Sequence, residues 1–156
     1  MTVAEHEFWM RQALAQAEIA LSLAEVPVGA VAVFQGEIVG AGYNRKESDQ
    51  DPTRHAEIIA MQEAARTLGN WRLLDVTLYC TLEPCPMCGG AMIQARLPRL
   101  VYGAKDIRFG ADGSLLELFA IEEFNHRVEV TAGVLADEAA TLLQDFFRQL
   151  RFSRSV

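Results

Sequence analysis

The chain has 156 residues, the size of one ordinary domain, and a core of this size folds without disulfide bonds. Hydrophobic residues make up 51% and charged residues 22%, a globular composition that excludes fibrous and disordered chains. No apolar run approaches the roughly 20 residues needed to span a bilayer. The first residues also lack the basic and apolar regions of a signal peptide. We therefore expect a single cytoplasmic domain over residues 1–156 that does not contact a membrane.

Charge is distributed unevenly along the chain. Fourteen basic and twenty-one acidic residues give a net charge of −7, which disfavours binding of duplex nucleic acid over the whole surface. The last eleven residues nevertheless hold Arg148, Arg151 and Arg154 and no acid. These arginines either complement the dipole of a C-terminal helix or form a local basic rim, and both interpretations stay open.

The expected elements alternate between helices and strands. Apolar residues at helical spacing predict a helix over 5–25 that ends before Pro27, and two β-rich runs at 28–34 and 38–43 form a hairpin. Turn and N-cap residues at 51–53 introduce a second helix over 54–68. The elements that follow are a strand at 75–81, a helix over 84–96 with Pro84 in its first turn, a strand at 100–102, a glycine-rich loop at 105–114, a strand at 128–131 and a helix over 138–151. This order predicts an α/β fold with a mixed sheet covered on both faces.

The three cysteines lie within nine residues, a poor framework for disulfides and a better one for metal binding. Cys85 and Cys88 are three residues apart at a helix start, so their sulfur atoms point the same way and the helix dipole favours their thiolates. With His55 from the preceding helix start, they form a ligand set that suits Zn²⁺. Three protein ligands leave a fourth position for water, which is typical of catalytic zinc. Cys80 is expected to be a buried apolar residue of its strand, and Met87 to pack in the core.

Glu57 follows His55 by two residues and is well placed to face that water. Its carboxylate can accept a proton from the water and pass it to a leaving amine. Alone, His55 would be an ordinary residue at a helix start and Glu57 a solvated acid. The conjunction of both helix starts instead favours hydrolysis of an amidine-like C–NH₂ bond.

His-x-Glu followed by Pro-Cys-x-x-Cys is the signature of the zinc nucleobase deaminases. Beyond that signature, the sequence resembles the bacterial tRNA-specific adenosine deaminase family over nearly the whole chain. The segments that carry the resemblance are residues 42–44, 51–57, 78–88, 102–106, 110–114, 125–127 and 145–148. The zinc motif indicates only the superfamily, whereas the segments after residue 102 favour the tRNA enzymes.

The resemblance implies a three-layer αβα fold with a five-stranded mixed sheet, a homodimer, and conversion of the wobble adenosine in a tRNA anticodon stem-loop to inosine with release of ammonia. His55, Cys85 and Cys88 would hold one Zn²⁺ per subunit, and Glu57 would be the general acid and base. Asn44 would hydrogen-bond the flipped-out nucleoside, and the backbone of Ala56 would touch the base. The RNA contacts implied are Asp106, Phe146, Phe147 and Arg148.

Two other functions compete with this hypothesis. The acidic composition favours a deaminase of a free base or nucleoside, such as guanine or cytosine, although such a small ligand needs no arginines outside its pocket. A zinc-stabilised binding module without catalysis is the second alternative, but a structural site would normally recruit a fourth protein ligand. Phe109, in a loop where a polar residue is expected, has no role in any of these hypotheses.

Overall fold

A five-stranded sheet forms the centre of the structure, a computed structural model that describes residues 1–154. The strands are β1 (Gly29–Phe34), β2 (Glu37–Tyr43), β3 (Thr77–Leu82), β4 (Arg99–Ala104) and β5 (Glu129–Thr131), in the spatial order β2-β1-β3-β4-β5. β1 is antiparallel to both of its neighbours, whereas β3, β4 and β5 run parallel. The predicted mixed sheet is therefore confirmed. The last two residues of the predicted domain lie outside the described range.

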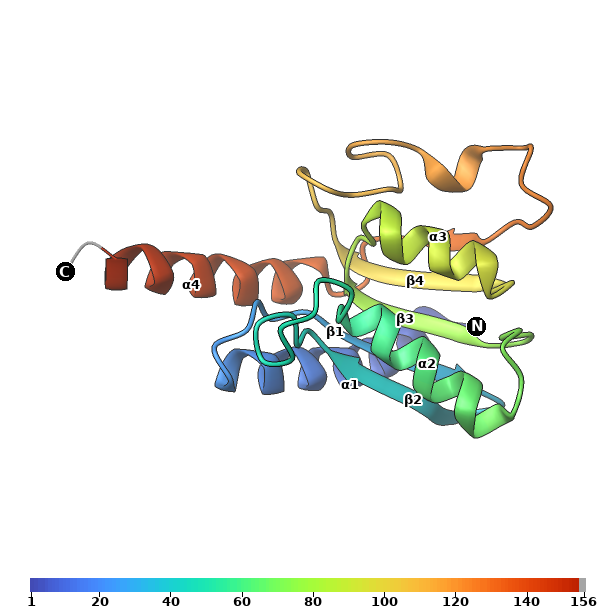
Figure 1. The fold of residues 1–156 in the computed structure, drawn as a ribbon, viewed down its shortest axis with the longest axis horizontal. Coiled ribbons are helices and arrows are strands. Elements are labelled where there is room, and N and C mark those ends of the chain that lie inside the picture. The colour runs from blue at the N-terminus through green and yellow to red at the C-terminus, as the bar shows by residue number, and fades with distance from the viewer. Residues whose placement is uncertain (155–156) are drawn as a thin grey trace.

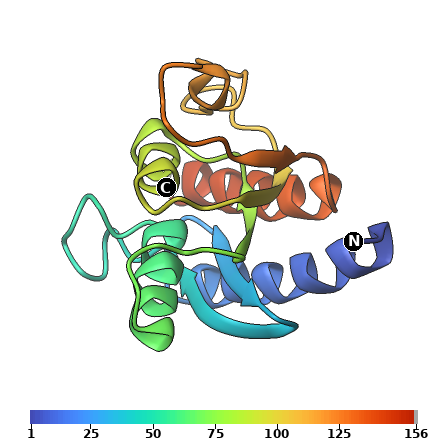
Figure 2. The ribbon, with the colours of Figure 1, turned by 90° about the vertical axis from the view of Figure 1, so that its right-hand side faces the viewer.

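Helices cover both faces of this sheet. α2 (Ala56–Leu68) and α3 (Pro86–Gln94) lie on one face, and α1 (Val3–Ser22) and α4 (Ala136–Arg154) lie on the other (Figures 1 and 2). Because side chains alternate along a strand, Leu78 and Cys80 of β3 pack in the core beneath α2 and α3, and Tyr79 packs in the core beneath α1 and α4. The predicted three-layer αβα fold is confirmed.

Glycines in β2 allow α2 to pack unusually close to the sheet. A Cβ atom on Gly42 would lie 2.5 Å from the carbonyl oxygen of Ala56, and one on Gly40 would overlap the backbone of Ala60 and Ala64. Because no side chain intervenes, the start of α2 rests directly on the hairpin. This contact places His55 and Glu57 against the end of the sheet.

Several helix boundaries differ from those predicted, and the caps explain two of the differences. The third helix begins at Pro86 and not at Pro84, because Cys85 is the N-cap with extended backbone (φ −76°, ψ 172°) and Pro86 occupies the first helical position. The second helix begins at Ala56 with His55 as its N-cap, because the Asp51 carboxylate bonds to Thr53 and prolongs the preceding turn. The first helix is Val3–Ser22 and ends five residues before Pro27.

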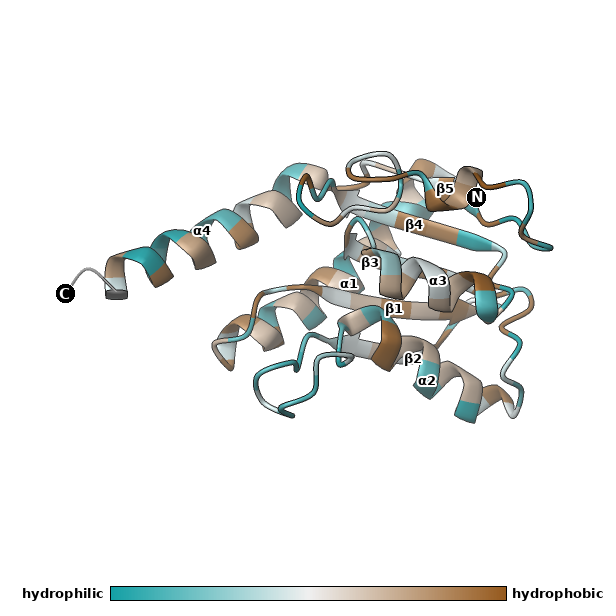
Figure 3. Ribbon diagram, turned by 45° about the horizontal axis from the view of Figure 1, so that its top comes forward, coloured by the Kyte–Doolittle hydropathy of each residue, from teal (hydrophilic) through white to brown (hydrophobic). Residues whose placement is uncertain are grey.

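The final helix runs further than predicted and leaves the body of the protein. Its first turns pack on the sheet through Ala139, which is 1% exposed, and the rest extends beyond the edge of the layers (Figure 1). Polar and apolar residues alternate along this projecting part (Figure 3). Between β4 and β5, a long loop crosses over α3 and includes the short helix η1 (Leu118–Ala120). Among residues 1–154, no helix has the length and apolar character needed to cross a bilayer.

Candidate active site

His55, Cys85 and Cys88 meet where the starts of α2 and α3 lie side by side. The Nδ1 atom of His55 is 3.6 Å from the Cys85 Sγ atom and 3.4 Å from the Cys88 Sγ atom. All three ligand atoms lie within 4.8 Å of one another. The sequence prediction that these residues converge is thus confirmed.

The two helix starts explain this convergence. His55 and Cys85 are both N-caps, so each side chain stands at the open end of its helix, and Cys88 lies one turn into α3. The backbone N–H of Cys88 donates to the Cys85 Sγ atom at 3.5 Å, which fixes the cysteine turn. Helix N-termini carry positive partial charge and therefore stabilise thiolate ligands.

The ionisation of the three side chains is coupled. Hydrogen bonds from Cys88 and His55 lower the pKa of Cys85 to about 4, although burial opposes this shift. The hydrogen bond to Cys85 and burial together raise the pKa of Cys88, and the bond to Cys85 also raises the pKa of His55. The cluster therefore stabilises negative charge on the Cys85 sulfur atom, next to the imidazole of His55.

The donor set and spacing fit a zinc ion. For tetrahedral Zn²⁺ with Zn–S near 2.3 Å and Zn–N near 2.0 Å, a nitrogen and a sulfur ligand are separated by about 3.5 Å. The distances from His55 Nδ1 to the two sulfur atoms match this separation. Cys80, in contrast, is fully buried and donates its thiol to the carbonyl oxygen of Leu82 at 3.0 Å. It stays outside the ligand cluster, as predicted.

Glu57 lies beside the ligands and is 4% exposed. Burial raises its pKa, an effect that the nearby His55 partly opposes. A buried carboxyl group with a raised pKa holds its proton more readily than a solvated one, which favours a role in proton transfer. It lies in the first turn of α2, beside the ligand cluster, and its role as general acid and base stays a prediction.

A pocket of about 390 Å³ opens beside these residues, within the size range of small-ligand sites. Asn44, His55, Ala56, Glu57, Cys85 and Asp106 all line it. The Asn44 amide donates to Val26 O at 3.3 Å and accepts from Lys46 N at 3.1 Å, which fixes its orientation and leaves one N–H free to donate. Contrary to the prediction of core packing, Met87 is 36% exposed and lies at the pocket wall, because it is on the outer side of the α3 start.

Comparisons with known proteins agree on the kind of site. A profile of the MafB19-like deaminase family matches residues 4–151. The tRNA-specific adenosine deaminase of Streptococcus pyogenes is 45% identical over 97% of this chain and 89% of its own length. That of Haemophilus influenzae is 47% identical over 96% of this chain and 87% of its own length. The chain belongs to the tRNA-specific adenosine deaminase family.

Solved structures give the same grouping. A wobble-position tRNA deaminase that performs A-to-I editing has a TM-score of 0.84 and 40% identity, over 87% of this chain and 99% of that one. A guanine deaminase from Nitrosomonas europaea has a TM-score of 0.75 and 26% identity, over 90% of this chain and 83% of that one. Both are cytidine-deaminase-like folds, and the tRNA deaminase family is the more similar of the two.

In this member of the tRNA-specific adenosine deaminase family, a second hollow adjoins the pocket. This basic groove has a volume of about 900 Å³ and shares the wall residues Lys46, Asp106 and Phe109 with the pocket. Five cations and one acid line it, namely Lys46, Lys105, Arg108, Arg148, Arg151 and Asp106. A strongly acidic chain thus concentrates positive charge beside its reaction pocket.

The predicted RNA contacts lie in different places around this groove. Phe147 and Arg148 line it from α4, and Asp106 lines it from the loop after β4. Among the described residues, Phe146 lies outside the linings of both hollows and packs its ring edge-on against Phe147. The side chain of Arg154 is outside the described part of the chain.

Three residues around the site had no role in the sequence predictions: Lys46 and Glu83 were not singled out, and Phe109 was noted only as an unexpected loop residue. Lys46 and Phe109 each line both hollows, and Phe109 is 60% exposed. Glu83 is 1% exposed and accepts hydrogen bonds from the loop after β4. The only sequence signal for Glu83 is its place two residues before Cys85, within the zinc motif.

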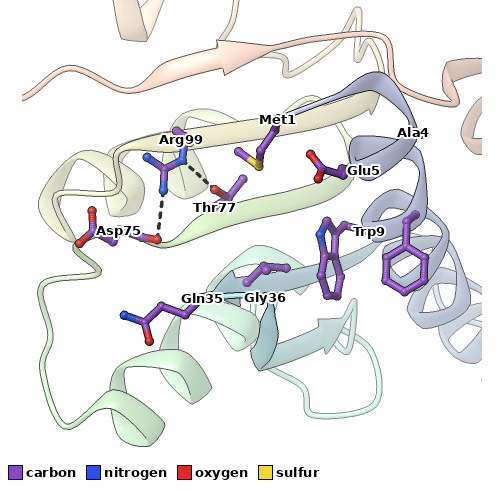
Figure 4. A pocket seen from close by; sticks show the side chains of 11 residues that line it. Met1, Ala4, Glu5, Trp9, Gln35, Gly36, Asp75, Thr77 and Arg99 are labelled. Atoms are coloured by element: carbon purple, nitrogen blue, oxygen red, sulfur yellow. Dashed lines mark hydrogen bonds between the residues drawn. The ribbon is translucent and has the colours of Figure 1, made fainter.

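A separate hollow of about 770 Å³ lies at the other end of β3, between the start of α1 and the starts of β3 and β4 (Figure 4). Arg99 in its wall donates to the Thr77 hydroxyl at 2.8 Å and to the Asp75 carbonyl oxygen at 3.1 Å. These bonds tie two neighbouring strand starts together. The hydrogen bonds of Arg99 in this hollow stabilise the sheet, whereas the ligand cluster and its pocket lie at the opposite end of β3.

Proposed function

We propose that this chain hydrolyses the wobble adenosine of a tRNA anticodon stem-loop to inosine and ammonia. The observation that carries the proposal is the continuity of two hollows: a pocket with a metal-ligand triad and a buried glutamate opens into a basic groove. The pocket fits one nucleobase, and the groove fits the phosphates on either side of it. Loop nucleotides can be splayed out into such pockets.

His55, Cys85 and Cys88 would hold the zinc ion. Zinc, when bound in such a site, supplies a water activated at neutral pH. Glu57 would accept a proton from the attacking water and pass it to the departing amino group. The water oxygen would add to C6 of the adenine, and the C–N bond would then break so that ammonia leaves. Asn44 would hydrogen-bond the nucleoside through its second amide N–H, and the backbone of Ala56, which lines the pocket, would touch the base.

The groove supports an RNA substrate over a free base. Each exposed cation that contacts a phosphate releases counterions and adds affinity, which a small uncharged ligand cannot exploit. A guanine deaminase has a similar fold, and a free base or nucleoside is therefore the second candidate. The two candidates differ in whether the groove contributes to catalysis.

We also infer a homodimer in a reducing cytoplasm. The loop between β4 and β5 supports the dimer, because it exposes a concentration of apolar side chains: Leu115, Leu116, Ile121 and Phe124. Light scattering on the purified protein would measure the mass, and a single-chain mass would contradict the dimer.

The reducing compartment is supported by the cysteines. All three cysteines are free, and a reducing compartment would keep Cys85 and Cys88 available to metal.

The proposed activity is tested with a transcribed anticodon stem-loop that carries adenosine at the wobble position. A matched stem-loop with adenosine moved to another loop position serves as the control, together with free guanine and cytosine. We expect inosine only in the first RNA. Ammonia released from guanine or cytosine, with both RNAs unchanged, would favour the free-base alternative.

A further inference from the structure

One buried carboxylate connects the metal-binding turn to the loop that forms the shared wall of both hollows. Glu83 is 1% exposed, and four hydrogen bonds reach its two oxygen atoms. The backbone N–H of Asp106 donates at 3.0 Å and that of Asp112 at 2.8 Å. Ser114 donates both its backbone N–H, at 3.3 Å, and its hydroxyl.

All four donors belong to residues 105–114, which we call the substrate loop. This segment carries Asp106 and Phe109, which line both the pocket and the groove. It also carries two of the groove cations, Lys105 and Arg108. The position of the loop therefore sets where the groove meets the pocket.

The contact is close and continuous with the zinc motif. A Cβ atom on Gly110 would overlap the Glu83 carboxylate, so the loop lies directly on it. On either side, Glu83 N donates to Ala104 O and Ala111 N donates to Pro84 O, each at 2.8 Å. Cys85 follows immediately. One short segment thus holds a metal ligand and fixes the substrate loop.

The partners of Glu83 in the described part of the chain are hydroxyl and amide donors of this loop. A carboxylate is the side chain that accepts at both of its oxygen atoms, and charged acceptors make the stronger hydrogen bonds. Glutamine has the same shape, but its NH₂ group would face the N–H and O–H donors of the loop. Those buried donors would lose their acceptor, which costs free energy.

We propose that Glu83 is a positioning residue: it clamps the substrate loop to the metal-binding turn and thereby sets the register of the RNA strand over the pocket. The inference rests on the proposed function. Glu83 lines the pocket but not the groove, and both of its oxygen atoms accept hydrogen bonds from the loop. It therefore acts through Asp106, whose carboxylate in turn accepts a hydrogen bond from the backbone N–H of Phe109.

The test compares zinc-loaded full-length Glu83→Gln with Glu117→Gln. Glu117 is exposed on the same long connection, so its replacement removes the same charge and leaves the clamp intact. We expect Glu83→Gln to raise KM for the wobble stem-loop by about tenfold, with a much smaller change in kcat. Glu117→Gln leaves KM unchanged or lowers it, because removal of an acid alone favours RNA.

Hydrogen–deuterium exchange provides a readout that does not depend on activity. In Glu83→Gln, the amides of the substrate loop should exchange faster, while those of β3 and α2 keep their protection. Ser114→Ala removes one donor only and should produce a smaller change of the same kind. If Glu83→Gln does not fold, the exchange rate of the loop amides in Ser114→Ala provides the test: faster exchange supports the clamp, and unchanged exchange contradicts it.

The outcomes separate the two proposals. A wild-type protein that leaves the stem-loop unchanged fails the proposed function at the first step, before any variant is compared. An active wild type whose Glu83→Gln variant keeps its KM and its loop protection overturns the role of Glu83 alone. A loss of thermal stability with unchanged KM would likewise show a purely structural residue.

Discussion

The reaction pocket and the basic groove share Lys46, Asp106 and Phe109 but differ in the charge of their linings. The acids Glu57, Glu83 and Asp106 and a single lysine line the pocket. In the groove the balance is reversed, with five cations against one acid. The pocket is thus suited to proton transfer on an uncharged base, and the groove to phosphate.

The two hollows therefore give different information about function: the pocket indicates the type of reaction, and the groove indicates the type of substrate. The pocket, with its ligand triad, specifies a deaminase but does not separate an RNA base from a free one. We infer that the groove has no role in the chemistry and selects the kind of substrate. Replacements in the pocket should therefore abolish turnover, and replacements in the groove should change RNA affinity and its salt dependence.

The largest effect is expected at Glu57. Glu57→Gln keeps the size of the side chain but removes its proton transfer, so kcat on the stem-loop should fall by about 10³-fold. Zinc content, measured by plasma mass spectrometry, should stay at one per chain, because Glu57 is not a ligand. Loss of zinc from this variant would contradict its assigned role.

Removal of a ligand should have both chemical and structural consequences. Cys88 is fully buried within the ligand cluster, so Cys88→Ala should lose zinc, activity and thermal stability together. Cys80→Ala is the matched control: it should cost about 1 kcal/mol of stability and keep its zinc. Stoichiometric zinc in Cys88→Ala, or none in Cys80→Ala, would show that the ligand set is wrong.

Replacements in the groove should leave the pocket intact. Arg148→Ala with Arg151→Ala removes two exposed cations, and the slope of log affinity against log salt should shrink by about 1.4, at 0.7 for each phosphate contact. Zinc content should not change. Arg66→Ala with Arg72→Ala removes the same charge away from the groove. Equal salt slopes in the two double variants would place the RNA surface elsewhere.

The smallest effect is expected at Glu25, which supports the wall that carries Lys46. Burial would raise the pKa of Glu25, but hydrogen bonds from Ser48 and Glu47 outweigh it and hold the pKa below its ordinary value. Its contribution to stability is therefore complete above about pH 5 and is lost as the pH falls through the lowered pKa.

Urea unfolding of wild type and Glu25→Gln measures this contribution. The difference in unfolding free energy between them should be larger at pH 7 than at pH 3.5. A difference that is independent of pH would contradict the role of the ionised carboxylate.

The sequence predicted the pocket better than the groove, for a physical reason. His55, Cys85 and Cys88 stand at fixed local spacings at helix starts, and the alternation of helices and strands sufficed for the fold. Lys46 and Phe109 come from loops, and their meeting depends on how those loops pack against α4. Local spacing carries no information about such contacts.

Glu83 and the helix caps illustrate the same limit. An acid next to a zinc motif has no periodicity that would indicate its four hydrogen-bond donors, which belong to three residues and lie 23 to 31 residues later. Pro84 and Pro86 are both compatible with a helix start, and only the cap formed by Cys85 distinguishes them. Arg148 and Arg151 were open to two interpretations until the groove brought them beside Lys105 and Arg108.

We infer that the groove, and not the pocket, selects RNA as the substrate. The most direct test measures kcat/KM for the wobble stem-loop and for free adenosine over a range of salt concentrations. We predict a strong preference for the stem-loop that declines steeply as salt rises, while any reaction of free adenosine is insensitive to salt. Equal values for the two substrates, with no dependence on salt, would contradict the account.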